Sequence, residues 1–541
     1  MTTHARRVSV LAVDARVRGQ GTEPGGTGRL AFGRNRQAVL LAIGLAALAL
    51  VAFLVRLVGL VRGPGMLGIL GHDDAVYYTA AVAFVEGRLP YRDFNILHPP
   101  GIVYLLSPFA ALGGVTGDST GFAIARLAVM VLGAVNTVLV GLVGRRAGTT
   151  AAICAAALYA VWVAPAAWER TTYLVAPQAT LLLVALHLLT GRAPETLTPR
   201  RVALAGACLG VAGVIQVWTF IPAAVIFGWL LLTYRSNVRT LVRMSAAYVA
   251  GGGATAVVLL LPFIATTGRQ MIDLIVFAQL RRTGAFSTGH VTRLRFLEGV
   301  PLNDQFQRVL PGVPTLAVNA AVVALFAAAA VFILYVAWRR PEIRLWAALL
   351  AVQTVFLMWT PVFYGHYAGW TAPLAALCIG ASAATIFDAL RPAGRQLAIG
   401  AFAIGLTALL FVALHPRGER VPIGADEPGL AAARCVTADE VILLISTEAV
   451  RRDLRNGCAF LPNPSGVVNA MYGSRGGPRL QRADNPDYQA AMERYYGSSD
   501  AALFLRLDHA ALTDDTLATI REQLPFERRV GDVLLLFRQA P

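Results

Sequence analysis

Residues 37–61 read QAVLLAIGLAALALVAFLVRLVGLV, an apolar run interrupted by a single charged side chain, Arg56. A helix needs about 20 such residues to cross the hydrocarbon core of a bilayer, so this run is long enough to span a membrane. The whole chain has 541 residues, of which 56% are hydrophobic, and its mean hydropathy is +0.59. This composition excludes an ordinary soluble protein and predicts a multi-pass membrane protein, mainly α-helical.

Ten further apolar runs follow, which gives about eleven predicted spans. They lie near residues 121–143, 147–165, 174–190, 202–221, 222–234, 244–264, 314–338, 343–362, 371–388 and 396–414. The run 222–234 is short for a bilayer, so it is tilted, begins earlier or is miscounted. The apolar stretch 99–112 is shorter than a span, and we expect a helix lying in the membrane interface there.

The charge pattern predicts the orientation of these spans. The net charge of +16 comes from Arg alone, because the chain contains no Lys. In a membrane protein an excess of basic residues indicates cytoplasmic loops rather than nucleic-acid binding. Arg-rich segments fall on alternate loops, at 145–146, 192–201, 235–243, 339–344 and 391–395. With an odd number of spans, the N-terminus is predicted to be cytoplasmic and the C-terminal region extracytoplasmic.

Three regions follow from this reading. Residues 1–36, rich in Arg and Gly, are predicted to form a disordered cytoplasmic tail. Residues 37–415 form the transmembrane domain, and its first outer loop covers 63–98. Residues 416–541 are predicted to fold as a small α/β domain, with strands at 440–445, 501–507 and 530–537 and helices at 447–455 and 513–524.

The five cysteines divide by position. Cys154, Cys208 and Cys378 fall in apolar spans and are interpreted as small buried side chains. Cys435 and Cys458 lie in the polar C-terminal region. If that region is extracytoplasmic, these two cysteines are predicted to pair, the alternative being two separately buried thiols.

The first outer loop holds most of the candidate chemistry. It contains Gly71-His72-Asp73-Asp74, then Tyr77-Tyr78, then Pro90-Tyr91-Arg92-Asp93-Phe94, and ends with His98-Pro99-Pro100-Gly101. Ionised groups beside a bilayer are costly unless they have a role. Asp73 and Asp74 also suit the start of a helix, where acidic residues favour the dipole. The alternative is a catalytic site in which a carboxylate accepts a proton while Arg92, Asp93 and His98 face the same cavity.

These motifs resemble the GT-C superfamily of integral membrane glycosyltransferases, and more narrowly the bacterial branch related to protein O-mannosyltransferases and lipid A aminoarabinose transferases. The resemblance is strongest over residues 50–146. A second piece, Phe363-Tyr364-Gly365-His366-Tyr367 running into Trp370-Thr371-Ala372-Pro373, is similar to a late His-Tyr segment of the same superfamily.

The resemblance implies an inverting transfer of a sugar from a polyprenyl-phosphate donor to an acceptor on the outer face. It implies that Asp73 is the catalytic base and that Asp74 supports the acceptor or orients Asp73. His98 holds the position of a basic residue that contacts the donor phosphate, although His is a weaker permanent cation than Lys.

Other residues have open alternatives as substrate contacts. Arg56 either extends to the interface or reaches the donor phosphate. His366 and Tyr367 either contact the donor or belong to an interfacial aromatic belt, and Tyr77 is a further candidate contact. Arg281 and Arg282, in the long outer loop 265–313, either guide a phosphate or are simply solvated.

The expected partners are a polyprenyl-phosphate-linked sugar, an envelope glycan, lipid or protein as acceptor, and membrane lipid, with no nucleic acid. No metal-binding spacing, phosphate-binding loop or dinucleotide motif is present, so we expect no metal or cofactor, and a nucleotide-sugar donor is disfavoured. The alternative function is a transporter or flippase of lipid-linked sugars, although the chain shows no inverted repeat. A third possibility is an inactive relative that binds cell-wall glycan. The sequence specifies neither the sugar nor the acceptor.

Overall fold

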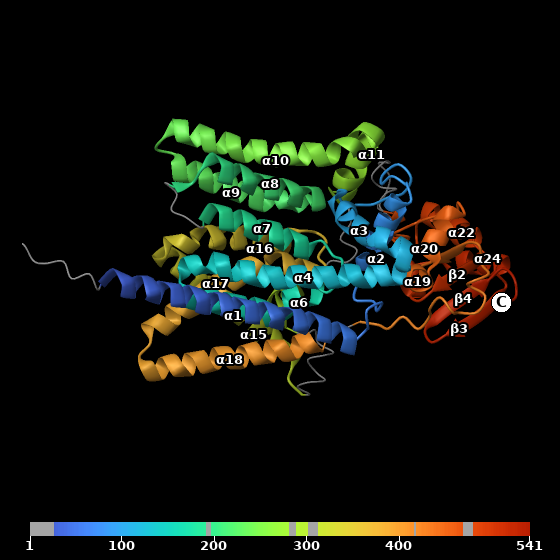
Figure 1. The fold of residues 1–541 in the computed structure, drawn as a ribbon. Coiled ribbons are helices and arrows are strands. Elements are labelled where there is room, and N and C mark those ends of the chain that lie inside the picture. The colour runs from blue at the N-terminus through green and yellow to red at the C-terminus, as the bar shows by residue number, and fades with distance from the viewer. Residues whose placement is uncertain (1–25, 191–195, 281–287, 301–311, 416–417, 469–479) are drawn as a thin grey trace, which may run out of the picture. The chain divides into compact units, whose positions relative to one another are not determined.

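The computed structural model describes residues 26–190, 196–280, 288–300, 312–415, 418–468 and 480–541. The chain divides into two compact units, Met1–Gly44 and Leu45–Pro541. The second unit contains a bundle of long helices and, at one end of the bundle, a small domain built on a four-stranded sheet (Figure 1). The predicted fold class, a transmembrane helical bundle with a small C-terminal α/β domain, is confirmed.

The bundle is made of long helices and the short helices that connect them. In chain order they are α1 (Gly26–Arg62), α2 (His72–Val85), α3 (Gly101–Thr116), α4 (Asp118–Gly144), η1 (Arg145–Ala147), α5 (Thr149–Val161), α6 (Val163–Trp168), α7 (Val175–Thr190), α8 (Pro199–Ile215), η3 (Val217–Thr219), α9 (Phe220–Tyr234), α10 (Val238–Thr267), α11 (Arg269–Ile272), η4 (Asp273–Phe277), α12 (Ala278–Leu280), α13 (His290–Glu298), α15 (Thr315–Arg339), η5 (Pro341–Ile343), α16 (Arg344–Trp359), η6 (Gly365–Tyr367), α17 (Ala368–Ala389) and α18 (Pro392–Leu414).

All eleven predicted spans are helical, but two of them cover more than one α-helix: 147–165 includes α5 and part of α6, and 202–221 includes α8, η3 and the start of α9. Among the described residues, eight helices are long and apolar enough to cross a membrane, judged by length and composition. The short run at 222–234 begins earlier, because η3 and α9 together form an 18-residue candidate, Val217–Tyr234. Pro222 lies in the first turn of α9, where its missing N–H costs no helix hydrogen bond. The first helix begins at Gly26, upstream of the predicted start, and residues 1–25 of the predicted tail lie outside the described residues.

Glycines let α8 and α10 approach closely. A Cβ at Gly206 would lie 2.2 Å from the Tyr248 carbonyl oxygen, and one at Gly251 would lie 2.0 Å from the Ala203 carbonyl oxygen. In a membrane, burying apolar side chains between helices gains little, because lipid tails are equally apolar. Small residues stabilise such contacts because they let the two backbones approach closely and pack. Substituting either glycine would therefore force the two helices apart.

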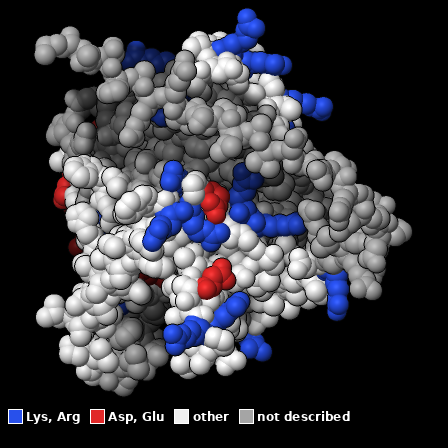
Figure 2. All heavy atoms as spheres, turned by 90° about the vertical axis from the view of Figure 1, so that its left-hand side faces the viewer, with Lys and Arg blue, Asp and Glu red and all other residues white. Residues whose placement is uncertain are grey.

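Figure 2 shows the end of the bundle that faces away from the small domain, and Arg side chains gather on it. The turns on this face join α4 to α5, α9 to α10, α15 to α16 and α17 to α18, and α8 begins there. Their basic residues are Arg145, Arg146, Arg200, Arg201, Arg235, Arg239, Arg243, Arg339, Arg340, Arg344, Arg391 and Arg395. The alternating Arg-rich segments of the sequence therefore lie on one face.

The small domain is organised around strands β1 (Val436–Ala438), β2 (Ala501–Phe504), β3 (Phe526–Val530) and β4 (Val533–Phe537) in the order β1-β2-β4-β3. β1 pairs with β2 in parallel, and the other two pairs are antiparallel. Alternate residues of β2 and β4 face opposite sides of the sheet, and both sides are covered by apolar side chains. This double burial explains why these strands are continuous apolar runs.

Helices cover the sheet on both sides. They are α19 (Ile442–Ser446), α20 (Ala449–Arg455), α22 (Pro486–Gly497), α23 (Leu507–Ala510) and α24 (Asp514–Gln523). The predicted strand at 440–445 is wrong, because these residues enter helix α19 and the strand of this region is β1. The α19 segment is buried on all sides, against α2, α4 and β1. A short segment buried all round shows no periodicity that distinguishes helix from strand.

Helix α20 docks the small domain on the bundle. Arg451 forms ion pairs with Glu86, at the end of α2, and with Asp118, at the start of α4. Glu448 accepts hydrogen bonds from the backbone N–H groups of Asp118 and Ser119, which lack partners within α4. A shared apolar core, to which Tyr78 and Leu443 belong, lies between the two parts. The small domain is therefore packed against α2 and α4.

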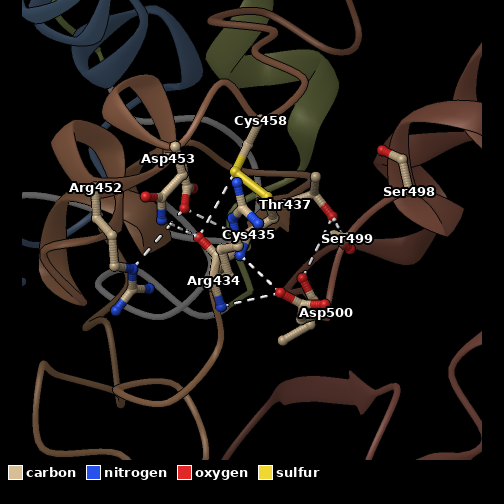
Figure 3. The surroundings of a disulfide bond; sticks show 12 residues. Arg434, Cys435, Thr437, Arg452, Asp453, Cys458, Ser498, Ser499 and Asp500 are labelled. Atoms are coloured by element: carbon tan, nitrogen blue, oxygen red, sulfur yellow. Dashed lines mark hydrogen bonds and ion pairs between the residues drawn. A yellow bond between two sulfur atoms is a disulfide. The ribbon is translucent and has the colours of Figure 1, made fainter.

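A disulfide joins Cys435, just before β1, to Cys458, just after α20 (Figure 3). The two Cα atoms are 5.7 Å apart. Asp500 accepts hydrogen bonds of 2.9 Å from the backbone N–H groups of Arg434 and Cys435. The bond therefore ties the first strand to the helix that docks on the bundle. The cysteines predicted in spans lie in α5, α8 and α17 as free thiols: Cys154, Cys208 and Cys378.

Candidate functional site

The first turn of α2 carries His72, Asp73 and Asp74 in succession, directly after Gly71. Acidic side chains are stabilised there by the partial positive charge of the helix N-terminus. Successive helix residues point about 100° apart, so the three side chains face three different surroundings. A Cβ on Gly71 would lie 2.3 Å from the Tyr173 hydroxyl, so glycine allows Tyr173 to approach the start of the helix.

Asp74 faces the interior and is fully engaged. Its side chain is 1% exposed and forms an ion pair with Arg126 of α4. The backbone N–H and the hydroxyl of Thr172 each donate to Asp74 Oδ1 at 2.7 Å. A buried carboxylate with this set of partners is held in one position. Asp74 therefore anchors α2 to α4 and to the segment before α7.

His72 faces the small domain. Its Nδ1 lies 2.8 Å from Glu440 Oε2, and its Nε2 lies 3.1 Å from Asn463 Oδ1. Burial, the largest single influence, lowers the pKa of His72. The Glu440 carboxylate, together with Asp73 and Asn463, outweighs burial and raises the pKa from 6.5 to about 9. The imidazole is therefore charged at neutral pH.

Asp73 lines a small cavity that is partly open to solvent. Three segments far apart in the sequence line this cavity: α2 with the loop after it, the turn before α17, and residues of the small domain. Among its described lining residues, Asp73 is the only carboxylate. The predicted site residues that the cavity brings together are Asp73, Tyr77, His98, His366 and Tyr367.

An aromatic wall next to Asp73 is made of rings that line the cavity and of Tyr173 and Trp168, which pack against His366. Tyr173 stacks on His366 with ring centroids 4.6 Å apart. Trp168 lies edge-on to His366 at 5.7 Å, and Tyr77 lies edge-on to His98 at 5.6 Å. Burial raises the pKa of Tyr173 well above its ordinary value, so its hydroxyl stays protonated. The wall offers apolar surface and hydrogen-bonding groups of neutral or positive character to a bound molecule.

Besides Asp74, three predicted site residues lie outside the cavity. Arg56 is completely buried in α1, where it forms an ion pair with Glu169 and donates to the Ala52 carbonyl oxygen at 2.9 Å. Arg56 is therefore held inside the helix bundle and does not reach the surface of the protein. Arg92 and Asp93 pair with each other at 2.8 Å on the surface, where the Arg92 side chain is 53% exposed. Arg281 and Arg282 lie outside the described residues.

Several residues next to the cavity were not singled out from the sequence. Tyr173 forms part of the aromatic wall, and Glu440 and Asn463 hold His72.

Two buried charged residues of the helix bundle did carry a signal in the sequence. Glu169 is a charged residue in a short loop between two apolar runs, a position that indicates a role. Arg126 carried the same signal, because it is a charged residue within a predicted span. Nothing local marked Glu440 or Asn463.

The described residues contain no group of three or more His, Cys, Asp or Glu side chains placed to hold a metal ion. The chemistry available at the cavity is therefore that of one carboxylate, two imidazoles and several tyrosine hydroxyls. A carboxylate at the start of a helix accepts a proton from a bound hydroxyl, and imidazoles donate hydrogen bonds to a phosphate.

Comparison with solved structures shows what the fold is similar to. An oligosaccharyltransferase from Archaeoglobus fulgidus, solved with zinc and sulfate, aligns over 88% of this chain and 70% of its own, with 14% identity and a TM-score of 0.54. ArnT from Cupriavidus metallidurans, solved with undecaprenyl phosphate, aligns over 93% of this chain and 98% of its own, with 15% identity and a TM-score of 0.51.

The apo form of ArnT gives a TM-score of 0.52 at 14% identity, over 94% of this chain and 99% of that one. No family model and no curated protein matches this chain by sequence. At such identities the likeness concerns the fold, and it confirms the GT-C type of fold that the sequence resemblance indicated.

Proposed function

We propose that this chain is a membrane glycosyltransferase of the GT-C type, which transfers a sugar from a polyprenyl-phosphate donor to an acceptor hydroxyl. The fold supports this proposal, because the similarity to ArnT extends over nearly the whole length of both chains. ArnT has been solved with undecaprenyl phosphate, a polyprenyl phosphate of the proposed donor class.

The observation that carries the proposal is the separation of the two acidic residues of α2. Asp74 is neutralised by Arg126 and buried, whereas Asp73 is half-buried and faces the cavity. A general base must reach the proton that it removes. In the proposal Asp73 is therefore the base, and Asp74 holds the helix that carries it.

The proposed reaction is a single displacement. The acceptor O–H bond breaks and its proton passes to the Asp73 carboxylate. The acceptor oxygen forms a bond to the anomeric carbon from the face opposite the phosphate. The bond from that carbon to the phosphate oxygen breaks, and its electron pair leaves with the polyprenyl phosphate. This displacement inverts the configuration of the sugar.

As the polyprenyl phosphate leaves, negative charge develops on its oxygens, and groups that donate hydrogen bonds to these oxygens stabilise that charge. His98 and His366 line the cavity together with Tyr364 and Tyr367, and the proposal assigns the phosphate to this side. Charge-assisted hydrogen bonds to phosphate are strong where water is largely excluded. Hydrogen bonds from the His98 or His366 ring would stabilise the departing phosphate.

The proposal assigns residues 1–36 and the Arg-rich face to the cytoplasm, 37–415 to the membrane domain, and 416–541 to the outside. It is supported by the gathering of Arg side chains on the face away from the small domain (Figure 2). An alkaline phosphatase fusion after Arg146 should be inactive, and one after His415 should be active. An inactive fusion after His415 would overturn the orientation.

The test of function compares Asp73→Asn with a matched control, Asp93→Asn. Both changes remove a carboxylate from the first outer loop, but Asp93 is paired with Arg92 on the surface. A deletion strain carrying each variant is analysed for envelope glycans and lipid-linked sugars, and membrane levels of the variants are matched by immunoblot. Asp73→Asn should lower transfer by about two to four orders of magnitude, and Asp93→Asn should leave it near the parent level.

A second measurement separates chemistry from binding. Purified Asp73→Asn protein in lipid nanodiscs should bind undecaprenyl phosphate as tightly as the parent, because the phosphate is assigned to the histidine side of the cavity. Transfer by Asp73→Asn within a few-fold of the parent would falsify the assignment of the base.

A further inference from the structure

The His72 ring lies between two oxygen atoms of the small domain. Asn463 Oδ1 accepts a hydrogen bond of 2.7 Å from the Gly466 backbone N–H, so this atom is the amide oxygen and acts as an acceptor. His72 Nε2 lies 3.1 Å from the same oxygen, and Nδ1 lies 2.8 Å from a Glu440 carboxylate oxygen. The Ser465 hydroxyl oxygen is also 3.2 Å from Nε2, and its O–H donates to Asn463 Oδ1, so this oxygen too faces the ring as an acceptor. A ring whose two nitrogens both face acceptors donates from both only as the imidazolium.

The charges around the ring favour this state. Glu440, from the segment before α19, forms the ion pair, and Asp73 lies next along the helix. Arg506 approaches the other Glu440 oxygen at 3.8 Å, so the carboxylate is shared between two cations. The ring is 15% exposed, which limits competition from water. The small domain therefore contacts α2 through the charged His72 ring, which is next to Asp73 in the helix.

The same turn of the small domain also reaches the cavity. Asn463 and Gly466 both line it, and Asn463 holds His72 at the same time. The position of this cavity wall and the position of the first turn of α2 are thus set by one cluster of contacts. Any change that loosens His72 moves the wall and Asp73 relative to each other.

We propose that His72 is a positioning residue. Its imidazolium binds Glu440 and the turn 463–466, holds the small domain on α2, and so fixes Asp73 relative to the cavity wall. This inference rests on the proposed transferase function. His72 acts through Asp73 and takes no proton from the acceptor. Transfer should then require the protonated ring and decline as pH rises past about 9, the pKa of His72.

The test compares Glu440→Gln with Glu419→Gln. Both replace a carboxylate that contacts Arg506, but Glu419 is 56% exposed and does not touch His72. In Glu440→Gln the ring loses its anionic partner while the side-chain shape is kept. The alkaline limb of kcat/KM should shift to lower pH by at least about one unit, and kcat at pH 8 should fall about twofold or more because the protonated fraction of the ring falls by that factor. Binding of undecaprenyl phosphate should stay unchanged, and Glu419→Gln should match the parent throughout.

A second readout does not depend on activity. With ¹⁵N-labelled histidine in nanodiscs, the parent at pH 8 should show the signal of a doubly protonated ring that disappears in His72→Gln and titrates at lower pH in Glu440→Gln. A neutral His72 at pH 8, or an unmoved alkaline limb in Glu440→Gln, overturns the positioning role while leaving the proposed function intact. If the parent protein transfers no sugar, the proposed function fails and the positioning role falls with it.

Discussion

Asp74→Asn tests whether the second acidic residue of α2 is an anchor. The change keeps the size of the side chain and removes the charge that balances Arg126. The sequence predicts a milder loss of turnover for Asp74 than for Asp73. The structure predicts a different kind of damage, because Arg126 would remain in the interior as an uncompensated cation.

The magnitude follows from the contacts that remain. Breaking a buried ion pair by removing one partner costs roughly 3–5 kcal/mol. Arg126 keeps hydrogen bonds to the carbonyl oxygens of Met66 at 2.7 Å and Gly68 at 2.8 Å, and it lies over the Phe122 ring at 4.5 Å. These contacts place the cost at the lower end, about 3 kcal/mol.

The assay is thermal unfolding of the purified protein in detergent, followed by tryptophan fluorescence. Asp74→Asn should lower Tm by several degrees, whereas Asp73→Asn should leave Tm nearly unchanged. Adding Arg126→Gln to Asp74→Asn removes the unbalanced charge and should recover part of the loss. An Asp74→Asn protein that melts with the parent would refute the anchoring role.

Three further outcomes are expected. His98→Ala should raise the donor KM several-fold, because the proposed phosphate contact is lost; unchanged KM and kcat would make His98 structural. Reducing the Cys435–Cys458 disulfide, which closes a loop with a sequence separation of 23, should destabilise the small domain by about 3 kcal/mol, and non-reducing mass spectrometry should recover the linked peptide. The pKa of His72 is raised from 6.5 to about 9 on folding, so its contribution of roughly 3 kcal/mol is complete below pH 6.5 and is lost as pH rises through 9. The protection factors for hydrogen exchange at the start of α2, which are corrected for the base-catalysed intrinsic rate, should therefore fall between pH 7 and 10, and constant protection factors would contradict the ion pair.

Much of the fold was predictable because membrane spans carry a strong local signal. Length and apolarity alone predicted the helical runs, including the eight described helices that are long and apolar enough to cross a membrane, and Arg on alternate loops predicted which turns share a face. The small domain was harder. Its buried segment 440–445 lacks periodicity and was predicted as a strand, and the actual strand β1 is only three residues long.

The site was predictable where its residues are neighbours in the sequence. Asp73, Tyr77 and His98 share one loop, and they share one cavity. The sequence did not indicate the ion pair between Arg56 and Glu169, because Glu169 lies 113 residues away and no local pattern predicts such a pair. The partners of His72 are also far away in the sequence, so no local pattern indicated them.

The distance along the chain between the two halves of the site affects how the protein is made. His72 and Glu440 are separated by 368 residues, and His72 and Asn463 by 391. At ordinary rates of translation, roughly 20–70 s pass between synthesis of the first half and the second. During that interval the early helices are already inserted, but the cavity has no wall on the side of the small domain. A nascent chain, or one truncated after α18, can therefore be inserted in the membrane but lacks a complete cavity for the proposed sugar transfer. The cavity is complete only when the last quarter of the chain has folded.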